Sequence, residues 1–94
     1  MAVPRSGQVT VTSGSTAVQG TSIEFGAGAR LVIKGHPSNS TYIVVGNNGA
    51  GTVELNDGHA LDPGEPVIAT VKNLNELWFN SPSALQKATW FWLD

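Results

Sequence analysis

The sequence contains no cysteine, so it can form neither a disulfide framework nor a thiolate metal site, and it offers no thiol nucleophile. At 94 residues it has room for one small domain, and small domains bury a lower fraction of their surface than large ones. Without covalent cross-links, self-association is the common remaining way to add buried area. We therefore expect a single domain that forms a homo-oligomer.

Charged residues are also scarce, since they make up 13% of the chain, against about 25% in typical soluble domains. Seven acidic residues outnumber the five basic ones. A nucleic-acid backbone attracts a concentrated positive field, and the basic residues are dispersed along the sequence. The sequence therefore predicts a polar, weakly charged surface and no nucleic-acid partner. The basic residues are Arg5, Arg30, Lys34, Lys72 and Lys87.

Long apolar runs are missing as well. No segment approaches the roughly 20 consecutive apolar residues of a membrane-spanning helix, and residues 1–5 lack the apolar stretch of a secretory signal peptide. We therefore expect a soluble protein made in a cytoplasm, with no membrane partner. The triplet Asn39-Ser40-Thr41 fits a glycosylation acceptor, but this has no bearing without a secretory route.

What the sequence does have is a series of short segments in which apolar and polar residues alternate, a pattern that predicts β-strands. Residues that favour turns separate them, and Pro63-Gly64 occupies the central positions that a type II turn prefers. The predicted strands cover residues 8–12, 21–25, 29–34, 41–45, 52–55, 67–71, 77–79 and 86–93, the second and third forming either a hairpin or one bent strand.

Sustained helical periodicity is absent, and the best helical candidates, residues 74–77 and 83–87, span about one turn. Seven to eight short strands separated by Gly, Pro and Asn are typical of an all-β, two-layer antiparallel β-sandwich with jelly-roll-like or immunoglobulin-like topology. We expect one such domain over residues 8–94, preceded by a flexible N-terminal arm of residues 1–7.

The last predicted strand carries large apolar side chains on both faces. Successive residues of a strand point to opposite sides, so Trp90 and Trp92 share one face while Phe91 and Leu93 share the other. One layer of protein cannot cover both faces. Either this strand is central, between the domain's own sheet and something else, or one of its faces is kept for a partner molecule.

Residue types that carry catalytic or metal-binding chemistry form no recognisable pattern. His36 and His59 lie in predicted turns, and their spacing matches no zinc site. Asp57, Asp62 and Glu65 lie near His59 in the sequence but do not follow the spacing of a calcium-binding loop. No nucleophile elbow surrounds any serine. We therefore expect no enzymatic activity, no cofactor and no metal site.

The glycine-rich segment of residues 47–51 resembles a phosphate-binding loop in composition alone. Such loops lead into a helix whose N-terminus faces the anion, whereas a predicted strand follows here. A hairpin turn is the better interpretation of this segment.

The three tryptophans, Trp78, Trp90 and Trp92, support three interpretations. They can fill the core of the sandwich, anchor an interface between subunits or with another protein, or form a flat platform on which sugar rings stack. The residues that we take as the candidate interface are Trp78, Phe79, Trp90, Phe91, Trp92 and Leu93.

From Tyr42 onward, the order of features resembles small structural proteins of tailed bacteriophages. An apolar strand ends in Val45-Gly46-Asn47, and a short return strand leads to the turn "G-x-x-L-x-P-G-E" at residues 58–65. An apolar strand, the segment "N-L-N-E-L-W-F" at residues 73–79 and a last strand at residues 88–93 follow.

This resemblance implies a β-sandwich that coats the virion, as a capsid decoration or cement protein or as an accessory piece of the head or tail. A weakly charged apolar surface agrees with it, because few charges keep the desolvation cost of a protein interface small. We therefore predict a non-enzymatic virion structural protein on the capsid surface that binds the major capsid protein and stabilises the head shell. The alternatives are a carbohydrate-binding accessory module of a phage fibre, with a glycan as partner, and a tail or connector component.

Overall fold

The computed structural model describes residues 4–46 and 58–93. In these residues the chain forms eight strands and one short 3₁₀ helix, and every strand pairing is antiparallel. The elements in chain order are β1 (Ser6–Val11), β2 (Val18–Gln19), β3 (Glu24–Gly35), β4 (Ile43–Gly46), β5 (His59–Leu61), β6 (Pro66–Asn73), η1 (Leu74–Glu76), β7 (Trp78–Asn80) and β8 (Gln86–Trp92).

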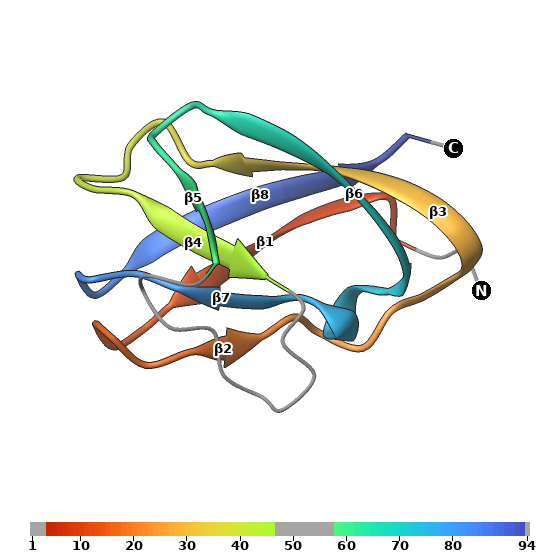
Figure 1. Ribbon diagram of the computed structural model, residues 1–94, viewed down its shortest axis with the longest axis horizontal. Coiled ribbons are helices and arrows are strands. Elements are labelled where there is room, and N and C mark those ends of the chain that lie inside the picture. The colour runs from red at the N-terminus through yellow and green to blue at the C-terminus, as the bar shows by residue number, and fades with distance from the viewer. Residues whose placement is uncertain (1–3, 47–57, 94) are drawn as a thin grey trace.

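The strands form two four-stranded sheets that pack face to face (Figure 1), as the predicted two-layer sandwich requires. Sheet A has the order β1-β8-β3-β6, and sheet B has the order β2-β7-β4-β5. The pairs β1–β8, β2–β7, β3–β6 and β4–β5 are those of one long hairpin. Winding that hairpin around a core adds the pairs β3–β8 and β4–β7. This arrangement is the eight-stranded jelly roll rather than the immunoglobulin topology.

Most strands agree with the sequence pattern. β1, β4, β6, β7 and β8 begin and end within two residues of the predicted bounds. The predicted strands at 21–25 and 29–34 form one bent strand, β3, because Gly26 and Gly28 take φ angles of 99° and 80° where the register shifts. The predicted strand at 52–55 and the hairpin turn at 47–51 lie outside the described residues.

Two strands and one boundary differ from the prediction. β2 and β5 have two and three residues, which is too short for an alternation to be visible in the sequence. β1 begins at Ser6, so Ser6 and Gly7 belong to the sandwich and not to the predicted arm of residues 1–7.

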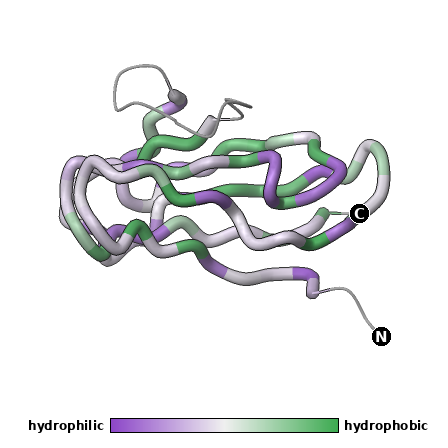
Figure 2. The backbone as a smooth tube through the Cα atoms, turned by 90° about the horizontal axis from the view of Figure 1, so that it is seen from below, coloured by the Kyte–Doolittle hydropathy of each residue, from purple (hydrophilic) through white to green (hydrophobic). Residues whose placement is uncertain are grey.

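The core lies between the two sheets, and Figure 2 shows the two layers from the side. Alternate residues of each strand point into it, as the period of two predicts. The side chains of the buried cluster are those of Val9, Val11, Phe25, Ala29, Leu31, Ile33, Ile43, Val45, Leu61, Val71, Leu74, Leu77, Phe79, Ala88 and Trp90.

The turn between β5 and β6 has the predicted type II form. The backbone N–H of Glu65 donates to the carbonyl oxygen of Asp62 at 2.9 Å. Gly64, at the third position, has a φ of 85°, a conformation that glycine adopts at little cost. This turn connects sheet B to sheet A at one end of the sandwich.

Candidate functional site

β8 is a central strand of sheet A, with β1 on one side and β3 on the other. Its inner face carries Trp90, which is 5% exposed and packs edge-on against Phe25 with ring centroids 5.6 Å apart. Its outer face carries Phe91, which is 47% exposed. The strand is therefore covered on one face by the domain's own core, while its other face meets solvent in a single copy of the chain.

The outer face of sheet A is the surface formed by the side chains that point away from the core on β1, β8, β3 and β6. Two rows of paired residues cross it. The strand register joins Ser6, Phe91, Val32 and Ile68 in one row. The next row contains Gln8, Thr89, Lys34 and Pro66.

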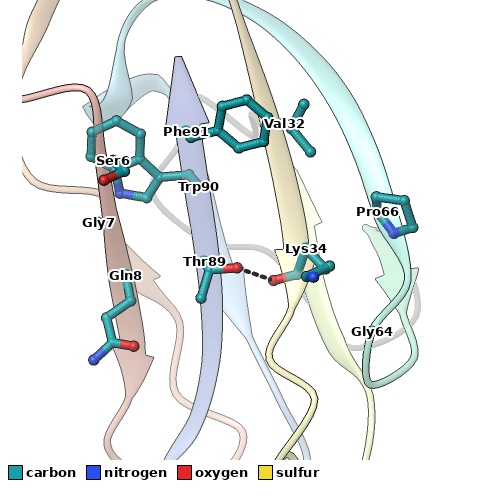
Figure 3. A pocket seen from close by; sticks show the side chains of 10 residues that line it. All are labelled: Ser6, Gly7, Gln8, Val32, Lys34, Gly64, Pro66, Thr89, Trp90 and Phe91. Atoms are coloured by element: carbon teal, nitrogen blue, oxygen red, sulfur yellow. Dashed lines mark hydrogen bonds between the residues drawn. The ribbon is translucent and has the colours of Figure 1, made fainter. Parts of the chain in front are cut away.

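This face is hollowed at its centre (Figure 3). The hollow is open to solvent and has a volume of about 810 Å³. Phe91 and Val32 lie side by side on its surface, while Trp90 extends toward β1. The lining residues are Ser6, Gly7, Gln8, Val32, Lys34, Gly64, Pro66, Thr89, Trp90 and Phe91.

Exposed apolar side chains concentrate on this face. Among the described residues, four large apolar side chains are strongly exposed: Ile68 (60%), Leu85 (66%), Phe91 (47%) and Leu93 (39%). Ile68 and Phe91 lie in the same row, and Leu93 continues the outer side of β8, where its N–H donates to the carbonyl of Arg30 at 2.9 Å. Leu85 lies apart, in the turn between β7 and β8. Such clustering is typical of an interaction surface.

Three of the five basic residues that are dispersed in the sequence lie near the apolar row on this face. Arg30 and Lys34 share the outer side of β3 with Val32, and Lys87 lies on the outer side of β8. From Ala29 onward in β3, and throughout β1, β6 and β8, no outward position carries an acidic residue. The outer face of sheet A is therefore apolar at its centre and carries basic side chains along β3 and β8, while the exposed acids Asp62 and Glu65 lie in the turn before β6.

The predicted interface residues do not form one surface. Phe79 is 0% exposed and Trp90 is 5% exposed, so both belong to the core. Phe79 offers no contact area to a partner, and Trp90 offers only the small part of its surface that lines the hollow. Trp78 precedes the inward-facing Phe79 and therefore lies on the outer face of sheet B. Phe91 and Leu93 remain on the outer face of sheet A.

Trp92 lies on the inner side of sheet A, at the end of the core, and is half-buried. Its ring centroid lies 5.0 Å from that of Phe25, and the guanidinium carbon of Arg5 lies 4.6 Å above its ring. The N–H of Trp92 also donates to the carbonyl of Arg5 at 2.8 Å. Trp90 and Trp92 therefore both lie on the core side of sheet A, while Trp78 lies on the outer face of sheet B. The platform of three rings that glycan stacking would use is not formed.

Sequence reasoning missed Val32, Pro66 and Ile68 as members of this surface. A signal was present for Val32, since the alternation of residues 29–34 places it with Arg30 and Lys34 on the side opposite the apolar Leu31 and Ile33. For Ile68 the signal is weaker, because alternation places it with Thr70, opposite Val67, Ala69 and Val71, and no charged residue marks its side within residues 67–71.

The histidines and acids of the predicted turns make local contacts. The Nδ1 atom of His36 accepts from the backbone N–H of Ser38 at 3.0 Å, and a Glu65 carboxylate oxygen accepts from the N–H of Asp62 at 2.9 Å. His59 lies in β5, and Asp57 lies outside the described residues. Within the part of the chain that the structure describes, no three His, Asp or Glu side chains gather as metal ligands do.

Asn39, the residue of the glycosylation-like triplet, connects the loop after β3 to β8. Its Nδ2 donates to the carbonyl oxygen of Lys87 at 2.7 Å, and its Oδ1 accepts from the N–H of Lys87 at 2.8 Å. These two bonds extend the β3–β8 ladder beyond its last pair, Gly35 and Ala88, with side-chain atoms in place of backbone atoms. The Asn39 side chain therefore has a structural role.

Comparison with known proteins found no matching family model, no matching curated protein and no matching solved structure. Across residues 4–46 and 58–93, no helix is long and apolar enough to cross a membrane.

Proposed function

We propose that this protein is a non-enzymatic structural component of a phage virion, a capsid decoration protein that binds the major capsid protein through the outer face of sheet A. The observation that carries the proposal is the row of Phe91, Val32 and Ile68, which places apolar side chains over three neighbouring strands, with Phe91 47% and Ile68 60% exposed. The resemblance of residues 42–93 to small phage structural proteins names the class of partner.

Burial of this row would stabilise a complex. Covering a large apolar side chain contributes about 1.5–3 kcal/mol when it passes fully from water to a protein contact. Phe91 and Ile68 are the two most exposed side chains of the row. The low content of charge keeps the opposing desolvation cost small. The jelly-roll topology agrees with the proposal, since it recurs in viral capsid domains, although a fold by itself does not determine a function.

A decoration protein stabilises a shell by mass action. Each copy that binds the assembled shell but not its dissociated subunits adds about 2.7 kcal/mol when its free concentration is 100 times its Kd. Many equivalent sites repeat this contribution over the shell. A weak contact per copy is therefore sufficient, and the self-association of the chain stays a separate prediction.

The test uses empty shells assembled from the major capsid protein encoded in the same phage genome. The chain is mixed with these shells and sedimented, and the bound fraction is measured against concentration. We expect saturable binding that Phe91→Ser weakens at least tenfold. Phe91 is a better probe than Trp92, because Trp92 contacts Phe25 and its loss would disturb the core.

Leu85→Asn is the matched control, because Leu85 is equally apolar and exposed but lies away from the outer face of sheet A. This variant should bind shells as the unmodified chain does. Failure of the unmodified chain to bind the shell, or equal binding by Phe91→Ser at unchanged strand content in circular dichroism, would contradict the proposal.

A further inference from the structure

We infer that the partner surface that fits the outer face of sheet A is acidic around an apolar centre, and that this face does not pair with a second copy of itself. The inference deepens the proposed function and rests on it for where the partner lies, but it can be tested without a shell. Lys34 and Lys87 lie close to the apolar row of Phe91, Val32 and Ile68.

The two lysines lie on one side of the apolar row, and Lys34 lines the hollow. Lys34 lies between Thr89 and Pro66, in the row next to Phe91, Val32 and Ile68. Lys87 lies one further step along β8, opposite Thr10 of β1. A partner that covers Phe91 and fills the hollow must therefore also approach at least one of these ammonium groups.

Both ammonium groups are available for such a contact. The hydrogen bonds of Lys34 and Lys87 with other described residues use backbone atoms: the carbonyl of Lys34 accepts from Thr89, and the N–H and carbonyl of Lys87 bond with Asn39. A carboxylate on a partner would be the complementary group, and complementary charge selects a partner and accelerates its association.

Self-pairing of this face would bring like charges together. A two-fold contact between copies places the same patch on both sides of the interface. Lys34 and Lys87 of one copy would then meet a face that carries no acidic residue at its outward positions between Ala29 and Gly35 or on β1, β6 and β8. Like charges across an interface disfavour the pairing.

The shape of the face favours a convex protein element over a membrane or a nucleic acid. A hollow cannot lie flush on a flat bilayer, and protein elements that insert into the interface present a protruding apolar face. Single-stranded nucleic acid uses several aromatic rings in a basic groove, whereas Phe91 is the one exposed ring among the side chains that line this hollow.

The width of the hollow also matches a protein element. It extends from β1 to the turn before β6 across a four-stranded sheet. Strands lie about 4.8 Å apart, so this span is about 14 Å. An α-helix with its side chains has a diameter of about 10–12 Å. A helix with leucines on one face and glutamates beside them would therefore seat its leucines on Phe91 and Val32 and its glutamates near the lysines.

The experiment uses two fluorescein-labelled amphipathic peptides, one built from Leu and Glu and the other from Leu and Lys at the same positions. Fluorescence anisotropy is measured with the full chain. We expect the Glu peptide to bind at least tenfold more tightly than the Lys peptide, and its affinity to fall severalfold when NaCl is raised from about 50 to about 300 mM. The double variant Lys34→Glu/Lys87→Glu should reverse the preference.

Two controls separate this contact from a general loss of structure. Leu85→Asn should leave the affinities for both peptides unchanged. Phe91→Ser should weaken binding of the Glu peptide, while the strand content in circular dichroism stays the same. Equal binding of the two peptides would overturn the inference. An affinity that changes neither with salt nor with the lysine substitutions would overturn it as well.

Three other outcomes would assign the face to a different occupant and also overturn it. The first is tighter binding to vesicles of 70% phosphatidylcholine and 30% phosphatidylserine than to the Glu peptide. The second is tighter binding to a 20-nucleotide oligo-dT than to that peptide. The third is a dimer in sedimentation equilibrium that Phe91→Ser dissociates. If the proposed function alone is wrong, the chain will bind the Glu peptide but not the shell, so the two failures give different results.

Discussion

A Cβ atom on Gly35 would lie 2.6 Å from the carbonyl oxygen of Asp62, so the end of β3 and the turn after β5 touch through their backbones. Two hydrogen bonds accompany this contact. The N–H of Gly64 donates to the carbonyl of Gly35 at 2.7 Å, and the N–H of Gly35 donates to the carbonyl of Glu65 at 3.1 Å. The contact joins the two sheets at the edge of the hollow that Gly64 lines.

Gly35→Ala should therefore reduce the free energy of unfolding by about 1–3 kcal/mol, the usual cost of forcing a methyl group into an occupied space. Urea denaturation followed by tryptophan fluorescence measures this change. Gly64→Asn is the control, because nothing lies within 4 Å of an added Cβ there and Asn tolerates a positive φ. A cost for Gly35→Ala no larger than that of Gly64→Asn would contradict the close approach.

Gln86 connects the loop before β4 to the start of β8. Its Oε1 accepts from the N–H groups of Ser40 and Thr41 at 2.8 and 3.2 Å, and its Nε2 donates to the carbonyl of Ala84 at 3.0 Å. Gln86→Leu would leave these backbone groups without their partner, so we expect a loss of about 2–4 kcal/mol in thermal or urea unfolding. Gln8→Leu, at an exposed position of β1, should change stability by less than about 0.5 kcal/mol. Similar effects of the two substitutions would refute the role assigned to Gln86.

Asn73 caps the 3₁₀ helix η1 and holds the chain before β3. Its Oδ1 accepts from the N–H of Asn75 and from that of Ile23, both at 2.9 Å, and its own N–H donates to the carboxylate of Glu76 at 2.7 Å. Asn73→Ala should cost about 1–2 kcal/mol, as for other N-cap residues. Asn75→Ala is the neighbouring control, and an equal loss of stability in both variants would show that the cap is not the cause.

Leu85 has a φ of 63° and is 66% exposed. The left-handed conformation costs a residue with a Cβ about 1–2 kcal/mol, and Asn adopts it more readily. Leu85→Asn should therefore raise the melting temperature, with a gain of about 0.5–1 kcal/mol. Leu85→Ala keeps the unfavourable φ and should show no such gain. An increase in both variants would mean that relief of backbone strain is not responsible.

The features of the fold that depend on residues close together in the chain could be predicted from the sequence. Pro63-Gly64 predicts the type II turn because one residue supplies a fixed negative φ and the next a positive one. The alternation in residues 86–93 separates Trp90 from Phe91. The two short strands were not readable, because β2 and β5 exist through their pairing with β7 and β4 and have almost no pattern of their own.

The sequence predicted part of the candidate site. The sequence indicates that one face of the last strand is kept for something outside the core, and Phe91 and Leu93 are on that face. It offers the core as only one of three interpretations of Trp90, it does not separate Phe79 from the candidate interface, and it does not place Ile68 with Phe91. Those assignments depend on which sheet each strand joins, and the paired residues lie up to 85 positions apart in the chain, as Ser6 and Phe91 show.

By itself, the sequence determined that this chain is a small all-β sandwich with a weakly charged surface, because alternation and turn chemistry act between residues close in the chain. The tertiary structure alone decided that the sandwich is a jelly roll and that dispersed residues form one surface. Lys34 and Lys87 lie beside Phe91, Val32 and Ile68 only because the wound hairpin places β8 and β6 on either side of β3. Strand register, which is set by distant pairing, determines which side chains become neighbours.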